Sequence, residues 1–507
     1  MYLPFFAAFA ASFLLLNFSL AYPKAALSSI NPEAFHPRIL MAKVKAQKNK
    51  DGSCYAHTVA SGETCQFMMD KFSITKNNLM QWNKNNFGWM GCDNGHPWIG
   101  DKVCVSDGTP PKPAYNKLAE CGPQASTDGT DIKCPLNACC SPYGFCGLTS
   151  DFCAVTKSPT GAPGTAGCLS NCGYGKVHTD TRSDFKKIVY WLDANDKLRT
   201  DPKALKSYYS VHYSFVNIKS DLTIDDSKIA KSTFLGISNK KIASFGGWEF
   251  STSASTYNIF RNGVADANRE KFATNLVNFL KKYNLDGIDL DWEFPGLSGI
   301  PGIPDDDKKD GQRYLELLKL IKSKLPAGKT LSITIPASFW YLKNFPIKDM
   351  QKYIDYQVFM TYDIRGTNSD SIVQCHTNKT EVINALQMLD KAGVQIGKTY
   401  GGLANYGRSY KLSSTSCSKV GCPVSGPGKK GPIVNTDGVL AQSEIDDIKT
   451  WGVKNKRWTD EASQCDFMIY DSNNIVGWPK AGQRNSMEDF FHHSGLAGSV
   501  LWAANYN

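Results

Sequence analysis

The sequence has 507 residues and a net charge of +10, from 57 Lys and Arg against 47 Asp and Glu. This length exceeds one ordinary domain of about 100–200 residues, so roughly two to four domains are expected. The 42% apolar and 12% aromatic content is typical of globular proteins and excludes a mostly disordered chain. The basic residues form no block of five or more, so the clustered charge of a nucleic-acid-binding protein is absent and no nucleic acid partner is expected.

Residues 1–21 are predicted to be a secretory signal peptide. An apolar run from Leu3 to Leu20 is followed by the small residue Ala21, near which cleavage is expected, although the usual basic residues before the run are missing. A membrane anchor is the alternative, because a spanning helix needs about 20 apolar residues. No basic flank follows the run, and the cysteine pattern favours secretion. We therefore expect an extracellular protein that has no membrane contact once it is processed.

Twelve of the 16 cysteines lie between Cys54 and Cys172. This density is typical of small modules that are held by disulfides in an oxidising compartment. The cysteines divide into two predicted modules, which we place at residues 54–105 and 118–174. Two Pro- and Gly-rich stretches are predicted as linkers, one between the modules and one in the tail of the second, at residues 106–113 and 157–167.

A zinc site is the alternative reading of such a cysteine-rich region. The adjacent residues Cys139 and Cys140 cannot easily give two ligands to one tetrahedral ion, and no paired histidines accompany them. We therefore expect no metal and no cofactor in this protein.

Residues 185–507 contain few cysteines and alternate strand-like apolar runs with amphipathic segments, such as those at 269–284 and 311–325. Alternation over about 320 residues predicts an α/β domain with a parallel sheet covered by helices, and a (β/α)8 barrel is the natural candidate. An open doubly wound sheet is the alternative, but no Gly-rich phosphate loop opens any of the helices. The expected strands are residues 187–193, 210–218, 240–248, 285–294, 331–337, 356–364 and 498–505.

One expected strand carries acidic residues at alternate positions, namely Asp289, Asp291 and Glu293. The period of two places all three on one face of the strand, and the apolar residues between them face covering helices. Neighbouring carboxylates raise one another's pKa, which suits a proton donor at Glu293 near neutral pH. A calcium site is the alternative, but such sites usually lie on loops rich in Asn and Gly.

The segment DGIDLDWE, from Asp286 to Glu293, resembles the signature of glycoside hydrolase family 18, the chitinases. Further family motifs follow in the right order, at SFGG (244–247), MTYDIRG (360–366), YGRSY (406–410) and LWAAN (501–505). The resemblance implies a (β/α)8 TIM barrel with an inserted α+β subdomain. It also implies an endo-acting chitinase that retains the anomeric configuration by substrate-assisted catalysis.

The resemblance also implies roles for single residues. Glu293 would protonate the glycosidic oxygen, Asp291 would orient the acetamido group of the substrate, and Asp289 would share a proton with Asp291. Tyr362 would hold the acetamido oxygen, whereas Asp286 is expected to be structural. Tyr190 and Ser244 would lie beneath the carboxylates, and Trp502 would form the floor under the reacting sugar. The substrate-binding positions implied in this way are Tyr190, Ser244, Gly247, Trp248, Phe294, Met360, Asp363, Arg408 and Trp502.

The sequence departs from the family pattern in two places. Phe294 stands where Tyr is usual, so one hydroxyl of the cleft is missing. The sequence ends five residues after Trp502, so no helix is expected after the last barrel strand. Because barrel strands are normally covered on the outside, we expect the last strand to lack a helical cover of its own.

The second module resembles the hevein-type chitin-binding module through CGPQ, NACCSPYGFCG, DFC and CLSNC. Eight cysteines allow about 105 pairings from sequence alone; the family pattern implies Cys121–Cys140, Cys134–Cys146, Cys139–Cys153 and Cys168–Cys172. Exposed rings in so small a domain are poorly explained as core, and flat sugar faces stack on them. The resemblance implies sugar contacts at Ser141, Tyr143, Phe145 and Phe152.

The first module resembles a fungal LysM module through YAHTVASGETC, ITKNNLMQWN and HPWIGDKVC. Its four cysteines suggest two bridges, whose pairing the sequence leaves open. The loop at residues 61–65 and the segment near Asn83 are the expected sugar contacts. The expected core residues are Val59, Ile74, Leu79 and Trp82.

Taken together, the motifs predict a secreted endo-acting chitinase that two modules target to chitin or another N-acetylglucosamine polymer. A lectin-like protein with an inactive barrel is one alternative. A toxin-delivery subunit is another, because the module order resembles that of the chitinase-bearing subunits of yeast killer toxins; its toxin partner would be unknown. The presence of Glu293 with Asp289, Asp291 and Tyr362 favours an active enzyme.

Overall fold

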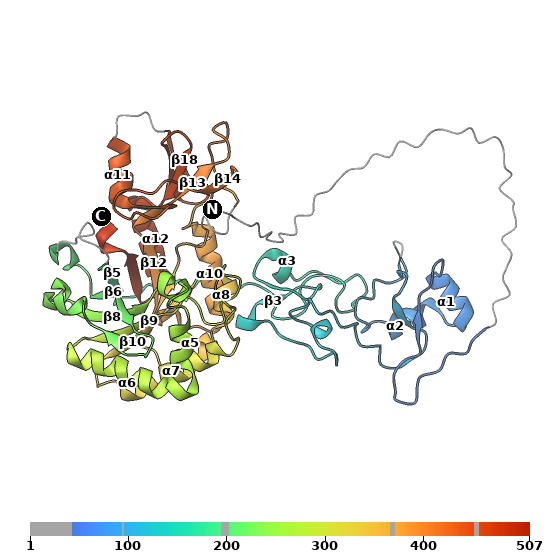
Figure 1. Cartoon of the computed structure of the whole chain (residues 1–507). Coiled ribbons are helices and arrows are strands. Elements are labelled where there is room, and N and C mark those ends of the chain that lie inside the picture. Colours follow the sequence, from blue (N-terminus) through green and yellow to red (C-terminus); the bar gives the residue numbers. More distant parts are fainter. Residues whose placement is uncertain (1–42, 94–95, 194–201, 366–370, 451–455, 507) are drawn as a thin grey trace.

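The computed structural model describes residues 43–93, 96–193, 202–365, 371–450 and 456–506. The predicted signal peptide, residues 1–21, lies outside this range. Among the described helices, none combines the length and the apolar character that a membrane span requires. Figure 1 shows two small modules beside a large barrel domain.

The first module pairs strand β1 (Ala56–Thr58) antiparallel with β2 (Lys102–Cys104) and carries helices α1 (Cys65–Phe72) and α2 (Lys76–Trp82). Both helices begin at a threonine whose side chain accepts a backbone N–H of the first turn, which is the usual way to satisfy such orphan donors. The pairing that the sequence left open is Cys54–Cys104 and Cys65–Cys92.

The expected core of the first module is wrong at Trp82, and within the expected sugar-contact segment the side chain of Asn83 is buried. Trp82 is half-buried and lies outside the apolar cluster, whereas Trp89 is buried within it. Asn83 is fully buried, and its amide bonds the backbone oxygens of Leu79 and Cys104 and the backbone N–H of Cys104. A buried amide with these partners holds the fold together and is closed to a sugar.

The second module contains β3 (Cys139–Cys140), β4 (Cys146–Gly147), α3 (Ser150–Cys153) and two 3-10 turns (Pro123–Ala125 and Pro135–Asn137). Three of its sulfurs, on Cys121, Cys134 and Cys140, lie within 4.8 Å of one another, but each belongs to a disulfide and offers no thiolate to zinc. The four bridges are those that the hevein-type resemblance implies: Cys121–Cys140, Cys134–Cys146, Cys139–Cys153 and Cys168–Cys172.

The two stretches predicted as linkers are packed against the first module. In the stretch 157–167, Ala162 joins the apolar cluster of that module, and the Thr160 hydroxyl donates to the backbone oxygen of Trp89 (2.6 Å). In the stretch 106–113, the Thr109 backbone pairs with Gly52 and Cys54. Both stretches therefore pack onto the first module, because their small residues allow close backbone contacts that composition alone does not reveal.

Eight parallel strands close into a barrel in the third domain. Strand β5 pairs with both β19 and β6, which excludes the open doubly wound sheet. The predicted (β/α)8 fold is thus confirmed. The barrel strands are β5 (Lys186–Leu192), β6 (Ser210–Ile218), β8 (Lys240–Gly246), β9 (Gly287–Asp291), β10 (Thr330–Pro336), β11 (Tyr356–Met360), β12 (Thr399–Ala404) and β19 (Gly498–Trp502).

Strand β12 was missing from the predicted set. Its sequence, TYGGLA, contains two glycines and lacks the alternation of a half-buried strand. A Cβ at Gly401 would lie 2.4 Å from the ring of Phe491, and one at Gly402 would lie 2.7 Å from the ring of Tyr362. Both glycines therefore serve close packing on the two faces of the strand, which only the folded barrel reveals.

Helices cover the outside of the barrel (Figure 1). Helix α6 buries Phe272, Leu276 and Leu280, spaced by four, as expected for one face of an amphipathic helix. The helices outside the insertion are α4 (Trp248–Thr252), α5 (Asn258–Val264), α6 (Asp266–Lys282), α7 (Asp310–Lys324), α8 (Phe339–Leu342), α9 (Ile347–Met350), α10 (Lys379–Lys391) and α12 (Ala481–His493). A short strand β7 (Ile224–Asp225) pairs antiparallel with the end of β6.

The last barrel strand is partly covered by the helix that precedes it. Ser499 points outward from β19, is buried, and donates to the Glu488 carboxylate of α12. Leu501, the next outward residue, is half-buried. Beyond β19, a 3-10 turn (Ala504–Tyr506) packs against β5.

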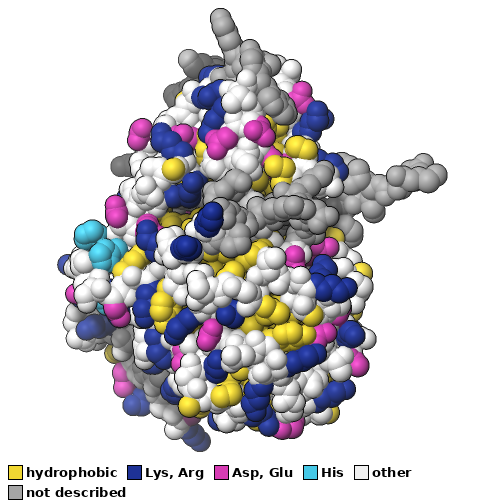
Figure 2. Space-filling model, turned by 90° about the vertical axis from the view of Figure 1, so that its left-hand side faces the viewer, with side chains coloured by type: hydrophobic (Ala, Val, Ile, Leu, Met, Phe, Trp, Pro, Cys, Tyr) yellow, Lys and Arg dark blue, Asp and Glu magenta, His cyan; other side chains and the backbone are white. Residues whose placement is uncertain are grey.

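The α+β insertion follows β12 and forms an antiparallel sheet at the top of Figure 1. Two disulfides, Cys375–Cys465 and Cys417–Cys422, stabilise it and account for the last four cysteines. Its elements are β13 (Tyr406–Leu412), β14 (Val424–Pro427), β15 (Val439–Ala441), α11 (Gln442–Thr450), β16 (Arg457–Asp460), β17 (Cys465–Tyr470) and β18 (Asn474–Trp478). On the face shown in Figure 2, basic side chains are interspersed with acidic ones, in line with a net charge that is spread along the chain.

Candidate active site

Strand β9 carries the acidic motif into the barrel. Asp289 and Asp291 point inward, and Glu293 follows two residues beyond the end of the strand. Trp292 points outward and packs against the rings of Phe260 in α5 and Tyr314 in α7, with centroids 5.5 and 5.4 Å away. The alternation expected from the sequence is thus present, and it lines the acids up along the barrel axis.

Asp286, which was expected to be structural, lies at the other end of this strand. Its carboxylate accepts the backbone N–H of Lys241 (2.9 Å) and pairs with Lys329 (3.5 Å). These contacts tie β9 to its neighbours at the end of the barrel away from Glu293.

Asp289 is fully buried beneath the other acids. Its carboxylate accepts the hydroxyls of Tyr190 (2.8 Å), Ser244 (2.9 Å) and Ser332 (2.7 Å), and the Nδ1 atom of His212 lies 3.4 Å away. Burial opposes ionisation, but the hydrogen bonds and His212 outweigh it, so the pKa of Asp289 is lowered. Asp289 therefore stays a carboxylate.

Asp291 is the next inward residue after Asp289, and its pKa is shifted in the opposite direction. Burial is the largest cause, and the charge of Asp289 adds to it, so the pKa of Asp291 rises to about 7 although the Thr334 hydroxyl donates to it. Below about pH 7 this pair of carboxyl groups therefore holds one proton, on Asp291, and loses it as the pH rises through 7. Such an arrangement lets a proton move when charge develops nearby.

Glu293 is half-buried at the mouth of the barrel. Its backbone N–H donates to the Ser251 hydroxyl of α4 (3.0 Å), which fixes the chain just beyond the strand. Burial of the carboxyl group, then the charges of Asp291 and Asp363, hold the pKa of Glu293 well above its usual value, against the effect of Arg408. Glu293 is therefore suited to remain protonated and to act as an acid near neutral pH.

A second polar group forms where β11 ends and the insertion begins. Arg408, on β13, donates two hydrogen bonds to the Asp363 carboxylate, and the His376 ring lies 3.3 Å from the same carboxylate. Burial opposes ionisation of Asp363, yet Arg408 outweighs it, and the pKa of Asp363 is lowered. Tyr362 is buried beside this pair, and burial followed by the charge of Asp291 raises the pKa of its hydroxyl.

Aromatic residues form the floor and wall of the site. Trp502, at the end of β19, packs against Tyr190 and Phe215, with ring centroids 5.1 and 5.8 Å away. Gly247 has a φ of +91°, and a Cβ there would lie 2.5 Å from the ring of Phe215, so only glycine fits. Trp248 follows and is 42% exposed, whereas Met360 is buried at the end of β11.

Phe294, the departure from the family pattern, is buried and stacks on Tyr341 of α8, with centroids 4.7 Å apart. Burial and then the charge of Glu293 raise the pKa of Tyr341. Tyr341 of α8, which follows β10, thus brings a tyrosine near the acid, whereas the resemblance implied a tyrosine at position 294, after β9.

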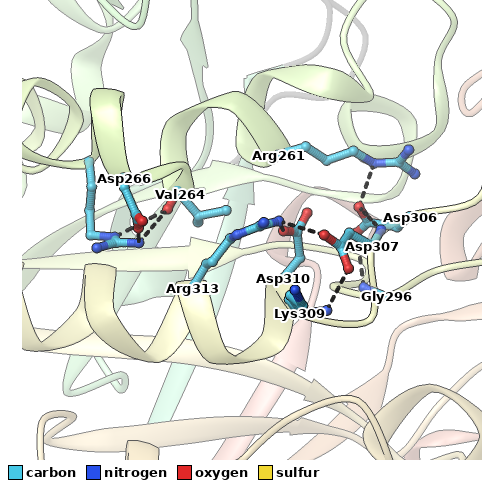
Figure 3. A network of polar contacts seen from close by, with 10 residues as sticks. Arg261, Val264, Asp266, Gly296, Asp306, Asp307, Lys309, Asp310 and Arg313 are labelled. Atoms are coloured by element: carbon cyan, nitrogen blue, oxygen red, sulfur yellow. Dashed lines mark hydrogen bonds and ion pairs between the residues drawn. The ribbon is translucent and has the colours of Figure 1, made fainter.

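A polar network anchors the loop that follows Glu293 (Figure 3). Asp306 accepts the backbone N–H of Gly296 (2.9 Å), and Arg261 of α5 lies 3.2 Å from its other oxygen. Burial first, then its hydrogen bond with Asp310 and the charge of that residue, raise the pKa of Asp306 to about 7. Arg313 of α7 pairs with Asp310 and holds it in place. The network joins two covering helices to the loop that positions the acid.

The candidate sugar contacts of the second module lie on one turn and a following helix. Ser141 is buried and its hydroxyl accepts the backbone N–H of Phe145 (3.2 Å). Tyr143 and Phe145 are exposed, at 75% and 40%, and Phe152 is half-buried over Gly147.

Sequence reasoning missed several residues that complete the site. For three of them a signal was available, because polar residues occupy alternate, inward positions of otherwise apolar strands. In β10 these are Ser332 and Thr334, and in β6 the fully buried His212. Ser251, Tyr341 and His376 lie outside the strands and had no such signal. The missed residues are His212, Ser251, Ser332, Thr334, Tyr341 and His376.

Replacing Asp291 by Asn should stabilise the protein at alkaline pH. The pKa of Asp291 is about 7 in the folded chain and about 3.9 when unfolded. The stability that the neutral form provides is complete below about pH 4 and is lost as the pH rises through 7, at roughly 1.4 kcal/mol per pH unit. Asn keeps an oxygen for the Thr334 hydroxyl and carries no charge. Calorimetry should therefore show a melting temperature several degrees higher for Asp291→Asn at pH 8.

The same two proteins compared at pH 4 provide the control, because both side chains are then neutral. Equal melting temperatures at pH 8 as well would contradict the raised pKa of Asp291.

Comparisons with known proteins agree with this geometry. A sequence profile of glycosyl hydrolases family 18 matches residues 186–507, and one of the chitin recognition protein family matches residues 120–172. The chain is 54% identical over 472 residues to the killer toxin subunits alpha/beta of Kluyveromyces lactis, covering 91% of this chain and 41% of that protein. It is 38% identical over 501 residues to the secreted chitinase LysM12 of Penicillium expansum, covering 90% and 33%. The chain thus spans less than half the length of these relatives.

Among solved structures, the Group IV chitinase of Ostrinia furnacalis shares the fold, with a TM-score of 0.56 at 21% identity over 63% of this chain and 93% of that chain. The family 18 profile covers more than half of the chain, and both curated relatives exceed 30% identity over at least 90% of it. This chain therefore belongs to family 18 of the glycosyl hydrolases.

Proposed function

We propose that this chain is a secreted, endo-acting chitinase that hydrolyses β-1,4-linked N-acetylglucosamine polymers. The observation that carries the proposal is the order of acids from β9 to the barrel mouth: the pKa of Asp289 is lowered, that of Asp291 is about 7, and that of Glu293 is raised well above its usual value. A retained, raised-pKa acid at the barrel mouth is expected of an enzyme and has no evident value for a lectin.

In the proposed reaction, Glu293 gives its proton to the glycosidic oxygen as the bond from that oxygen to C1 breaks. The acetamido oxygen of the same sugar attacks C1 and forms an oxazolinium ion. The Asp291 carboxylate accepts a hydrogen bond from the acetamido N–H, and the Tyr362 hydroxyl donates one to the acetamido oxygen. The Glu293 carboxylate then removes a proton from water as the water oxygen bonds to C1 and the bond from C1 to the acetamido oxygen breaks. This step restores both the acid and the acetamido group and leaves the configuration retained.

The domain assignment is part of the proposal. Residues 1–21 would direct secretion, residues 54–105 would be a LysM-like module, residues 118–174 a hevein-type module, and residues 185–507 the catalytic domain. The LysM assignment is supported by the βααβ order of the first module and by 43% identity over 154 residues, 28% of this chain and 20% of that protein, to the non-secreted LysM effector LysM17 of Penicillium expansum. We propose no metal or organic cofactor for the reaction.

Release of soluble N-acetylglucosamine oligomers from colloidal chitin by the purified chain would test the activity. A mixture of products of several lengths from the start would support endo-acting cleavage. Chitin retention without any released sugar would instead favour the lectin-like alternative.

A toxin-delivery role is the second candidate, favoured by the 54% identity to the Kluyveromyces lactis killer toxin subunits. In that role the chain would bring a partner subunit to a chitin-containing wall. The two functions are compatible, because hydrolysis and wall binding use different parts of the chain. Killing of yeast cells that requires an added partner, and that persists without hydrolysis, would identify delivery as the principal role.

Reduction should release the protein from chitin before the barrel unfolds. The modules are small and depend on their bridges, and losing one bridge from a small secreted domain costs about 2–5 kcal/mol. The barrel has a large apolar core with no disulfide among its eight strands. Chitin pull-down and far-UV circular dichroism should therefore respond at different dithiothreitol concentrations. Loss of both signals together would count against separable modules.

A further inference from the structure

Three consecutive aromatic residues in helix α8 have three different surroundings. Tyr341 stacks on Phe294, the residue that follows the acid Glu293. Phe339 packs against the buried cluster of the second module. Trp340, between them, is 54% exposed. Helix α8 therefore connects the catalytic site directly to the second module, and Figure 1 places it at the barrel edge beside β3.

A chain of contacts leads from Trp340 into that module. The Lys343 ammonium lies 3.7 Å from the centre of the Trp340 ring, and 3.8 Å from the Glu120 carboxylate. The other oxygen of Glu120 accepts the backbone N–H of Cys146 (3.1 Å), and its own backbone N–H donates to Gly144 (2.7 Å). Lys343 thus holds one face of the indole, and Glu120 holds the turn of the module at residues 141–146.

This turn carries the exposed rings of the module, Tyr143 at 75% and Phe145 at 40%. Exposed large aromatic side chains that gather near one another commonly mark a binding surface. Trp340 is exposed although its two neighbours in α8 are packed, and the Lys343 ammonium lies over one face of its ring. An exposed indole offers a flat apolar face to a ligand.

A second contact prevents the module from turning freely on the barrel. The Lys391 ammonium, at the end of α10, donates to the backbone oxygens of Asn171 (2.6 Å) and Gly173 (2.7 Å). Asn137 in turn donates to the backbone oxygen of Lys391 (2.7 Å), and Asp390 accepts the backbone N–H of Lys176 (2.8 Å). With α8 and α10 both engaged, the module has one orientation relative to the cleft.

We propose that Trp340 is a sugar-binding site between the module and the cleft, and that the three parts form one continuous track for a single β-1,4-linked N-acetylglucosamine chain. The proposal rests on the proposed function, because it takes chitin as the ligand of both ends. The chain lies in the cleft beside Glu293, passes over the indole of Trp340, and continues to Tyr143 and Phe145. Because the module is held in place, no linker entropy is lost when one chain engages both ends.

The test measures binding without turnover, in the Glu293→Gln background. The affinity for soluble glycol chitin, a long chain, is compared with that for the tetramer of N-acetylglucosamine. Trp340→Ala should weaken glycol chitin binding about tenfold and change tetramer binding less than about twofold. Trp340→Phe, which keeps a ring, should restore most of the loss. Tyr209→Ala, at an exposed ring held by Lys186 and Lys240, is the matched control and should change neither.

A double-mutant cycle with Tyr143→Ala tests continuity. If one chain spans both sites, the effect of Tyr143→Ala on glycol chitin affinity should shrink at least about threefold once Trp340 is replaced. An unchanged effect would mean that the module and the cleft bind separate chains, and would overturn the track. Equal losses for tetramer and glycol chitin, or no loss for either, would overturn the role of Trp340. These readouts are independent of hydrolysis, so an inactive wild-type chain would refute the proposed function alone.

Discussion

Replacing Glu293 by Gln should reduce the release of soluble sugars from colloidal chitin by about 10²–10⁴-fold. Gln has nearly the same shape as the protonated acid but cannot give its proton to the glycosidic oxygen. Because the raised pKa of Glu293 reflects its burial and its carboxylate neighbours, the neutral amide also removes a cost, so the variant should fold at least as well. Initial rates of sugar release, with circular dichroism as a check of folding, measure the effect.

Chitin retention should be unchanged in this variant, because the substitution leaves the exposed rings of the second module, Tyr143 and Phe145, intact. Glu316→Gln, on the outer helix α7, is a matched control that makes the same chemical change where no substrate is expected. It should keep full activity. Substantial turnover by Glu293→Gln would contradict its assignment as the acid.

A fully deacetylated chitosan oligomer should be inert, with a rate at least about 10³-fold below that of the acetylated oligomer of the same length. In the proposed mechanism the nucleophile is the acetamido oxygen of the substrate, and a well-placed intramolecular group is worth effective concentrations of about 10⁵–10⁸ M. The carboxylates of Asp289 and Asp291 lie on β9, which leads directly to Glu293, and are already engaged by hydroxyl groups. They are therefore poorly placed to replace the missing nucleophile.

Two measurements accompany this prediction. Proton NMR of the first product from N-acetylglucosamine oligomers should show the β-anomer in excess, and a thiazoline analogue of the oxazolinium ion should inhibit. The acetylated oligomer in the same assay is the control for enzyme quality. An initial excess of α-anomer, or efficient cleavage of the deacetylated oligomer, would exclude the mechanism even if Glu293 proved essential.

Features that depend on local patterns were predictable from the sequence. The alternation of Asp289, Asp291 and Glu293 with apolar residues placed the acids inside a barrel, and the structure has this arrangement. The (β/α)8 class followed from strands and helices that recur along the chain. Strand β12 was not predicted because its two glycines weaken the strand pattern. They are needed because the rings of Phe491 and Tyr362, from other elements, pack directly against the backbone there.

Three features of the first module were missed from the sequence for the same reason: the position of Trp82, the burial of Asn83 and the packing of the two Pro- and Gly-rich stretches. Residue type alone does not tell whether an asparagine or a tryptophan is buried. The packing of α2 buries Asn83 and leaves Trp82 half-buried. The stretches 106–113 and 157–167 have the composition of linkers, yet they pack against the first module because a neighbouring surface accepts them.

The sequence by itself determined which residues carry the chemistry, since a period of two along one strand is enough to line up three acids. Only the tertiary structure decided how those acids differ. Asp289 is ionised because hydroxyls from β5, β8 and β10 converge on it, whereas Asp291 is buried with a single donor and holds a proton to about pH 7. The tertiary structure likewise decided that α8 joins the module to the cleft. Solvation, charge and docking depend on atoms that are far apart in the chain, and no local pattern encodes them.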